Sequence, residues 1–166
     1  AAVQMHGLFT SDMILQRNEQ VAVYGTANAG EVVTVQFAGQ TKVGTADAGR
    51  RWKVLLDAMP ASSIGRAMSV TSTGGTNLSL TNILVGDIWI LGGQSNIDNP
   101  FATYDVAKLD IVGVSKNQIR LFRTDNSKGK LAPQTAVVPH ASLLGKWQNA
   151  TQTHLNSFSP AGYYMA

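Results

Sequence analysis

A mostly apolar run from Ile83 to Leu91 constrains the fold of this chain more than any other stretch, because it stops abruptly at Gly92 and Gly93. The run is short, rich in β-branched and aromatic residues and bounded by turn residues, which favours a buried strand over a helix. Such a strand fits the centre of an α/β sheet that is covered on both faces. The polar residues 94–96 are therefore expected at the carboxyl end of a strand, where open α/β sheets place their chemistry.

Ser95 is the candidate nucleophile of this turn. Glycines before it let the backbone turn sharply where larger side chains would clash. A helix that starts at Ser95 or Asn96 would direct free N–H groups toward a developing oxyanion. The pattern alone leaves a second interpretation open, in which the segment is a plain strand-to-helix turn with Ser95 or Asn96 as the N-cap.

Residues 1–80 carry the pattern of an all-β region. Residues 33–37 alternate between apolar and polar side chains, which predicts a strand with one buried and one solvated face. In residues 52–56, Trp52, Val54 and Leu56 alternate with Lys53 and Leu55, which predicts another strand. Residues 38–40 predict a hairpin turn. Five or six short strands at hairpin spacing are typical of a small β-sandwich.

The pattern changes after residue 87. Residues 118–123 predict a second core strand, since apolar side chains alternate there. Ser159 and Pro160 predict the start of a helix, with the serine as N-cap and the proline at the first helical position.

The composition excludes several classes of function. With no cysteine among 166 residues, disulfides, zinc–thiolate sites and thiol catalysis are excluded. The net charge of +3 comes from scattered basic residues, so no nucleic-acid partner is expected. No apolar run approaches the about 20 residues of a membrane helix, so no membrane partner is expected. Small residues from Ala1 to Val3 predict a mature end after signal-peptide removal, and hence a secreted or periplasmic protein.

Six blocks follow one another in a characteristic order. They are residues 8–17 (LFTSDMILQR), 23–31 (VYGTANAGE), 84–89 (LVGDIW), 93–96 (GQSN), 119–123 (IRLFR) and 158–164 (FSPAGYY). In this order they resemble the carbohydrate O-acetylesterases related to sialate O-acetylesterase, which belong to the SGNH-type (GDSL-like) hydrolases. The Gly-Gln-Ser-Asn block is similar to the nucleophile block of that family, and the resemblance extends over essentially the whole chain.

The resemblance implies a fold and an activity. The fold would be a β-sandwich over residues 1–82, followed over 83–166 by the first part of a three-layer α/β hydrolase domain with a parallel sheet, incomplete in this chain. The activity would be that of a serine esterase that removes O-acetyl groups from carbohydrates, either sialic acid or plant polysaccharide. Catalysis would proceed through an acyl-enzyme on Ser95, and neither a metal nor a cofactor is implied.

The same resemblance assigns the neighbours of the nucleophile. Gly93, Gln94 and Asn96 would form the nucleophile and oxyanion loop, and Asp98 would lie on the substrate side. From the residues alone, a structural role stays open for each, because Asp, Asn and Gln also support turns and cap short helices.

A serine nucleophile also needs a base. In the family this is a histidine of a later block, and none of His6, His140 and His154 matches that block. We interpret these three as surface or loop histidines, because a general base is defined first by its geometry. Two interpretations follow: the chain is one piece of a proteolytically processed enzyme, or its sequence is truncated. Under the first, the expected partners are the acetylated carbohydrate and a C-terminal chain of the same precursor, held in a heterodimer after cleavage and carrying the histidine.

Two alternatives remain. The chain could be a non-catalytic carbohydrate-binding β-sandwich, with Trp52, Trp89 or Trp147 as the sugar platform. Trp52 and Trp89 both lie in apolar strand patterns and are expected to be buried, which weakens this interpretation. The chain could also be an inactive hydrolase-like scaffold, because it lacks a recognisable base.

Overall fold

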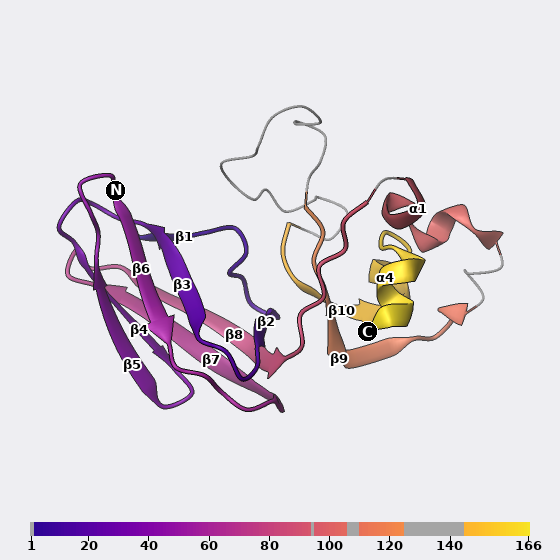
Figure 1. Ribbon diagram of the computed structural model, residues 1–166, viewed down its shortest axis with the longest axis horizontal. Helices are drawn as coiled ribbons and strands as arrows, with labels where there is room; N and C mark the ends of the chain where they lie inside the picture. Colours follow the sequence, from indigo (N-terminus) through magenta and orange to yellow (C-terminus); the bar gives the residue numbers. More distant parts are fainter. Residues whose placement is uncertain (1, 94, 106–109, 125–144) are drawn as a thin grey trace. The chain divides into compact units, whose positions relative to one another are not determined.

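The computed structural model describes residues 2–93, 95–105, 110–124 and 145–166. The chain forms two compact units, Ala1–Asp87 and Ile88–Ala166, which are called the first and second units below. Figure 1 labels their helices and strands. Among the described residues, no helix has both the length and the apolar character needed to cross a membrane.

The described residues of the first unit form two sheets. The larger sheet has the order β2-β8-β7-β4-β5 and the smaller the order β1-β3-β6. β2 and β8 pair in parallel, and the other neighbours pair antiparallel. The strands are β1 (Gln4–Met5), β2 (Ile14–Gln16), β3 (Val21–Thr26), β4 (Val32–Phe37), β5 (Gln40–Thr45), β6 (Arg51–Leu56), β7 (Ser62–Ser72) and β8 (Asn77–Gly86).

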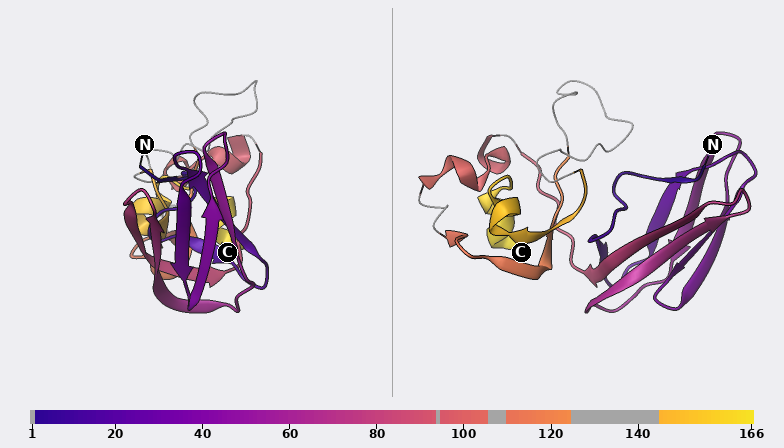
Figure 2. Two further views of the ribbon diagram at one scale, coloured as in Figure 1. Left: turned by 90° about the vertical axis from the view of Figure 1, so that its left-hand side faces the viewer. Right: turned by 180° about the vertical axis from the view of Figure 1, so that it is seen from behind.

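The predicted alternation is confirmed in β4 and β6. Val33, Val35 and Phe37 of β4 are at most 2% exposed, and Trp52 of β6 is 2% exposed. The Trp52 indole N–H donates to the Thr26 carbonyl at 3.2 Å, which satisfies its polar atom inside the core. Apolar faces of both sheets supply buried side chains, and this β-rich unit fits the predicted β-sandwich (Figures 1 and 2).

The predicted hairpin over residues 38–40 is also confirmed. Ala38 and Gly39 both have positive φ, 50° and 79°, and they connect β4 directly to β5. Two consecutive residues with positive φ match the twist of the strands that flank a tight hairpin.

The second unit corrects the predicted fold class. Its described residues hold one two-stranded antiparallel sheet of β9 (Ser115–Leu121) and β10 (Gln148–Thr151). Its described helices are short: α1 (Ser95–Asp98), the 3-10 helix η1 (Phe101–Thr103), α3 (Gln152–Leu155) and α4 (Pro160–Met165). The three-layer α/β domain with a parallel sheet is therefore wrong as a prediction for this chain.

The correction begins in the apolar run from Ile83 to Leu91, where contacts with the distant Arg17 lie at the end of β8. Ile83 is fully buried in β8, but β8 ends at Gly86. There the Arg17 N–H donates to the Gly86 carbonyl at 2.9 Å, and the Arg17 Nε donates to the Asp87 carboxylate at 2.9 Å. The run is thus divided between the end of a sandwich strand and a following stretch that belongs to no strand.

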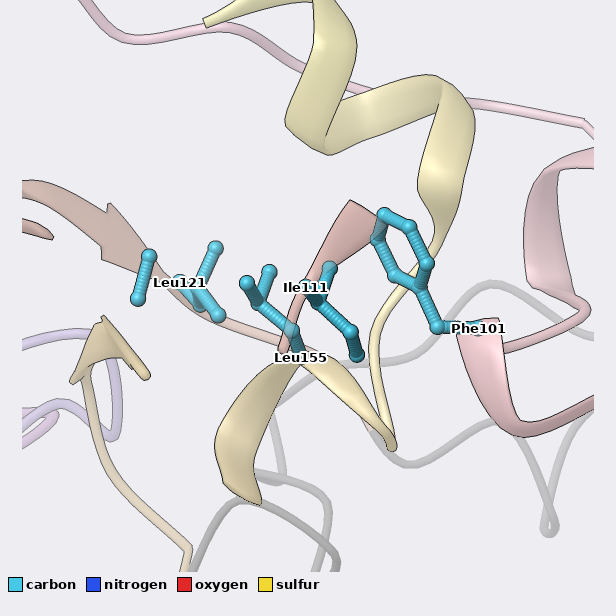
Figure 3. Packing of buried hydrophobic residues seen from close by; sticks show 5 residues of the cluster. Phe101, Ile111, Leu121 and Leu155 are labelled. Carbon is cyan, nitrogen blue, oxygen red and sulfur yellow. The ribbon is translucent and has the colours of Figure 1, made fainter. Parts of the chain in front are cut away.

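A small apolar cluster organises the second unit. Phe101, Ile111, Leu121, Ala150 and Leu155 are at most 2% exposed and pack together (Figure 3). They come from η1, from the segment before β9, from β9, from β10 and from α3. The cluster therefore joins the helical segments to the sheet.

The predicted helix start near the end of the chain is confirmed. α4 begins at Pro160, and Ser159 is its N-cap. The Ser159 hydroxyl oxygen accepts from the Gly162 N–H at 3.4 Å. This cap satisfies one of the N–H groups that the first turn of a helix leaves without a partner.

Candidate functional site

The nucleophile turn, residues 91–98, lies in the second unit. α1 starts at Ser95 and runs to Asp98, so Ser95 is the first residue of a short helix. The structure describes the backbone of Ser95 and Asn96, while Gln94 lies outside the described residues. The assignment of these residues to a catalytic loop stays a prediction.

Gly93 is the glycine that this turn needs. A Cβ at Gly93 would lie 2.8 Å from Ile97 Cγ1 and 3.3 Å from Ile97 Cβ. At Gly92 an added Cβ would meet no atom within 4 Å. The first turn of α1 therefore folds back closely over Gly93, and this close approach requires a residue without a side chain.

α4 holds Leu91, the first residue of the nucleophile turn. A Cβ at Gly162 would collide with Leu91 Cδ1 and would lie 2.9 Å from Phe158 Cε1. Gly162 is itself buried. The Leu91 side chain therefore packs directly against the α4 backbone, and α4 fixes the entry to the nucleophile turn.

A salt bridge holds the other end of α1. Arg123 Nη2 donates to Asp98 Oδ1 at 2.8 Å, and Arg123 Nη1 donates to the Ser157 carbonyl at 3.3 Å. The Arg123 side chain is 21% exposed and that of Asp98 is 45% exposed. Asp98 thus has a structural partner, and its predicted place on the substrate side stays a prediction.

One backbone and one side-chain hydrogen bond continue this support after α1. The Phe101 N–H donates to the Phe158 carbonyl at 2.9 Å, and Asn99 Nδ2 donates to the Tyr104 hydroxyl at 3.3 Å. Together with the buried Phe101 ring, these bonds fix the chain that leaves the turn. The residues before and after α1 are therefore anchored to the segment from Ser157 to Gly162. Asp98, at the end of α1, is anchored to Arg123, which follows β9.

The two described histidines, His6 and His154, each contact residues of their own unit. In the first unit, the His6 ring packs against the Tyr24 ring with centroids 4.9 Å apart. In the second unit, His154 Nδ1 lies 2.8 Å from the Asn149 carbonyl oxygen and 3.1 Å from Thr151 Oγ1. Because a carbonyl oxygen can only accept, Nδ1 of His154 carries the proton, and a neutral His154 has its lone pair on Nε2. His140 lies outside the described residues.

Two ionisable groups near the candidate segments have shifted pKa values. The hydrogen bond from Arg17 lowers the pKa of the Asp87 carboxyl. The hydrogen bond to Asp110 raises the pKa of the Tyr164 hydroxyl. Both are explained by these partners and need no catalytic role. Within the described part of the chain, no three His, Cys, Asp or Glu side chains gather in a way that could hold a metal ion.

Of the two tryptophans that were predicted to be buried, one is buried and the other is exposed. Trp52 is buried as expected, but Trp89 is 59% exposed, so its predicted burial is wrong. Its neighbour Ile90 is 93% exposed. An exposed apolar stretch therefore leads into the nucleophile turn. Sequence reasoning placed Arg123 in the predicted strand 118–123 and gave it no role in the site; it lies two residues after the end of β9.

Comparisons with known proteins found a similar enzyme among the solved structures. No family model matches it, and no curated protein matches it. Among solved structures, it is similar to a carbohydrate acetylesterase from Xanthomonas citri, with 28% sequence identity and a TM-score of 0.87 over 99% of this chain. The match covers 36% of that enzyme, so this chain spans about a third of its length.

A second similar structure is a bacterial immunoglobulin-like domain from the M. primoryensis ice-binding adhesin. It has 25% identity over 52% of this chain and 97% of that domain, but its TM-score of 0.34 is too low to carry an argument. The likeness to the acetylesterase supports a carbohydrate-esterase relationship for this chain, and membership of the SGNH family stays a prediction.

Proposed function

We propose that this chain is the nucleophile-bearing part of a serine esterase that removes O-acetyl groups from carbohydrates, either sialic acid or plant polysaccharide. The observation that carries the proposal is the likeness to a carbohydrate acetylesterase over 99% of the chain. Ser95 opens a helix directly after a glycine-dependent turn. A serine in such a turn fits the nucleophile of an acyl-transfer enzyme.

The proposed reaction is a two-step acyl transfer. A base takes the Ser95 hydroxyl proton while Ser95 Oγ attacks the acetyl carbonyl carbon, and the resulting oxyanion accepts hydrogen bonds from backbone N–H groups of the turn. The C–O bond to the sugar then breaks, and the sugar oxygen receives the proton. Water attacks the acetyl-serine in the second step, which releases acetate and restores the Ser95 hydroxyl.

The proposed base lies on polypeptide outside these 166 residues, in a C-terminal chain of the same precursor. Two observations support this placement. The acetylesterase matched by this chain has nearly two thirds of its length outside the matched part. Trp89 and Ile90, just before the turn, expose apolar surface that additional polypeptide would cover. Export from the cytoplasm, with a secreted or periplasmic location, belongs to the same proposal.

The test uses a fluorophosphonate, which labels activated serines, beside p-nitrophenyl acetate as the ester. In the intact protein that contains this chain, Ser95→Ala should abolish both labelling and turnover and leave the melting temperature unchanged. Ser115→Ala, at an exposed position at the start of β9, is the matched control and should retain both. Turnover that survives Ser95→Ala would refute the proposal.

A carbohydrate-binding module without catalysis is the second candidate, and the 59% exposure of Trp89 is the observation that favours it. Exposed tryptophans offer an apolar face to sugar rings. Under this alternative, Trp89→Ala abolishes sugar binding in calorimetric titration, while Ser95→Ala leaves the affinity unchanged. Under the esterase proposal, Ser95→Ala abolishes ester turnover, whereas a binding module without catalysis has no such turnover to lose.

A further inference from the structure

The position of α1 must be set from outside the helix. With four residues, Ser95–Asp98, α1 contains barely one turn. Helix formation is costly until several turns propagate, so a single turn has almost no stability of its own. Contacts made by its ends and side chains therefore decide where Ser95 lies.

Arg123 makes a charged contact with one end of α1. Its guanidinium joins the last residue of α1, through Asp98 Oδ1 at 2.8 Å, to the Ser157 carbonyl at 3.3 Å. Ser157 lies between α3 and α4, in the segment whose Phe158 carbonyl also accepts from the Phe101 N–H. One side chain thus ties α1 to the same segment that anchors the residues following it.

The geometry suits arginine in particular. Two different N–H groups of one rigid planar fork reach two acceptors on separate segments. The Arg123 side chain is only 21% exposed, so water screens this pair less than a fully solvated one. A lysine offers a single ammonium on a flexible stem and cannot hold both acceptors in one fixed arrangement.

We propose that Arg123 is a positioning residue for the esterase reaction: it holds α1 against the segment around Ser157 and thereby sets the place of Ser95. Arg123 acts through Asp98 and does not touch the substrate. This inference rests on the proposed function. Its consequence is that losing Arg123 slows attack by Ser95 on any ester, whatever the leaving group.

The experiment compares three variants of the intact protein, Arg123→Gln, Arg123→Lys and Asp98→Asn. Displacing a reacting group by about 1 Å can cost about 100-fold in rate. We therefore expect Arg123→Gln to lower kcat for p-nitrophenyl acetate and for an acetylated sugar by a similar factor, about 10- to 100-fold, with KM for the sugar unchanged. The rate of fluorophosphonate labelling at Ser95 should fall by the same factor, and Arg123→Lys should recover part of the loss.

Arg120→Gln is the matched control. Arg120 lies on β9, three residues before Arg123, and its Nε donates to the Asn117 carbonyl at 2.9 Å within that strand. This substitution should leave labelling and turnover unchanged. The double variant Asp98→Asn with Arg123→Gln should be no slower than the slower single variant, because groups that act through one contact are not additive.

Other results would overturn the inference. A loss confined to the acetylated sugar, with nitrophenyl acetate turnover and labelling intact, would mean that Arg123 and Asp98 serve substrate binding. Additive effects of the two substitutions would mean that they act separately. If Arg123→Gln lowers the melting temperature so far that it does not fold, the near-isosteric Asp98→Asn gives the same test. Failure of the proposed function is distinguished by turnover that persists in Ser95→Ala, whatever the Arg123 variants do.

Discussion

Replacing Gly93 by alanine tests whether the nucleophile turn depends on close packing. The new Cβ would lie 2.8 Å from Ile97 Cγ1 and 3.3 Å from Ile97 Cβ. Ordinary contact between carbon atoms begins at about 3.5 Å, so the first distance is about 0.7 Å too short. Rotation of the Ile97 side chain can move Cγ1 but leaves Cβ in place, and the first turn of α1 must therefore shift.

The expected cost has two parts. Overpacking of this kind destabilises proteins by about 1–3 kcal/mol, which a denaturant titration of the intact protein should detect. A shift of α1 by several tenths of an ångström displaces Ser95, and we expect fluorophosphonate labelling and p-nitrophenyl acetate turnover to fall by about 10-fold or more.

Gly92→Ala is the matched control, since its Cβ would meet no atom within 4 Å and neither glycine has a φ in the left-handed region. It should change neither stability nor labelling by a measurable amount. A second variant, Gly93→Ala with Ile97→Ala, removes the closer clash and should recover part of the labelling rate. Equal losses in Gly92→Ala and Gly93→Ala, or no recovery in the double variant, would refute the packing argument.

Two further predictions concern stability. Leu155→Ala empties part of the buried cluster of the second unit and should lower the free energy of unfolding by about 2–5 kcal/mol in a denaturant titration; a loss below about 1 kcal/mol would contradict the burial. In the first unit, hydrogen bonds from the Ser72 hydroxyl and the Asn28 N–H lower the pKa of the Glu31 carboxyl from its ordinary value of 4.5. The contribution of the ionised Glu31 carboxylate to the free energy of unfolding is therefore fully present above about pH 4.5. It is lost as the pH falls through the lower pKa that this carboxyl has in the folded state. Thermal melts between about pH 6 and pH 3 should show this decline, and Glu31→Gln should flatten it in part, the remainder belonging to groups such as Asp87.

The first unit was largely predictable because its information is local. Alternation over residues 33–37 and 52–56 depends only on the period of a strand, and the turn after Phe37 depends on the adjacent residues Ala38 and Gly39, of which the glycine adopts positive φ readily. The N-cap and proline at the start of α4 are likewise adjacent in sequence. Such signals need no knowledge of the tertiary fold.

The second unit was mispredicted where the deciding contact is distant. The run from Ile83 to Leu91 has the composition of one buried strand, but the bond between Arg17 and Asp87 spans 70 residues and marks its end. Periodicity carries no trace of such a partner. The pair of Asp98 and Arg123 is 25 residues apart and was missed for the same reason.

The parallel pairing of β2 with β8 has a consequence for synthesis on the ribosome. Ile14 pairs with Leu84 and Gln16 with Gly86, so the edge of the larger sheet joins an early and the latest segment of the first unit. Closing so long a loop is entropically slow compared with forming hairpins between neighbours. In a nascent chain, β2 cannot pair until β8 has emerged from the ribosome, so the first unit can reach its final sheet order only after the last of its strands is available.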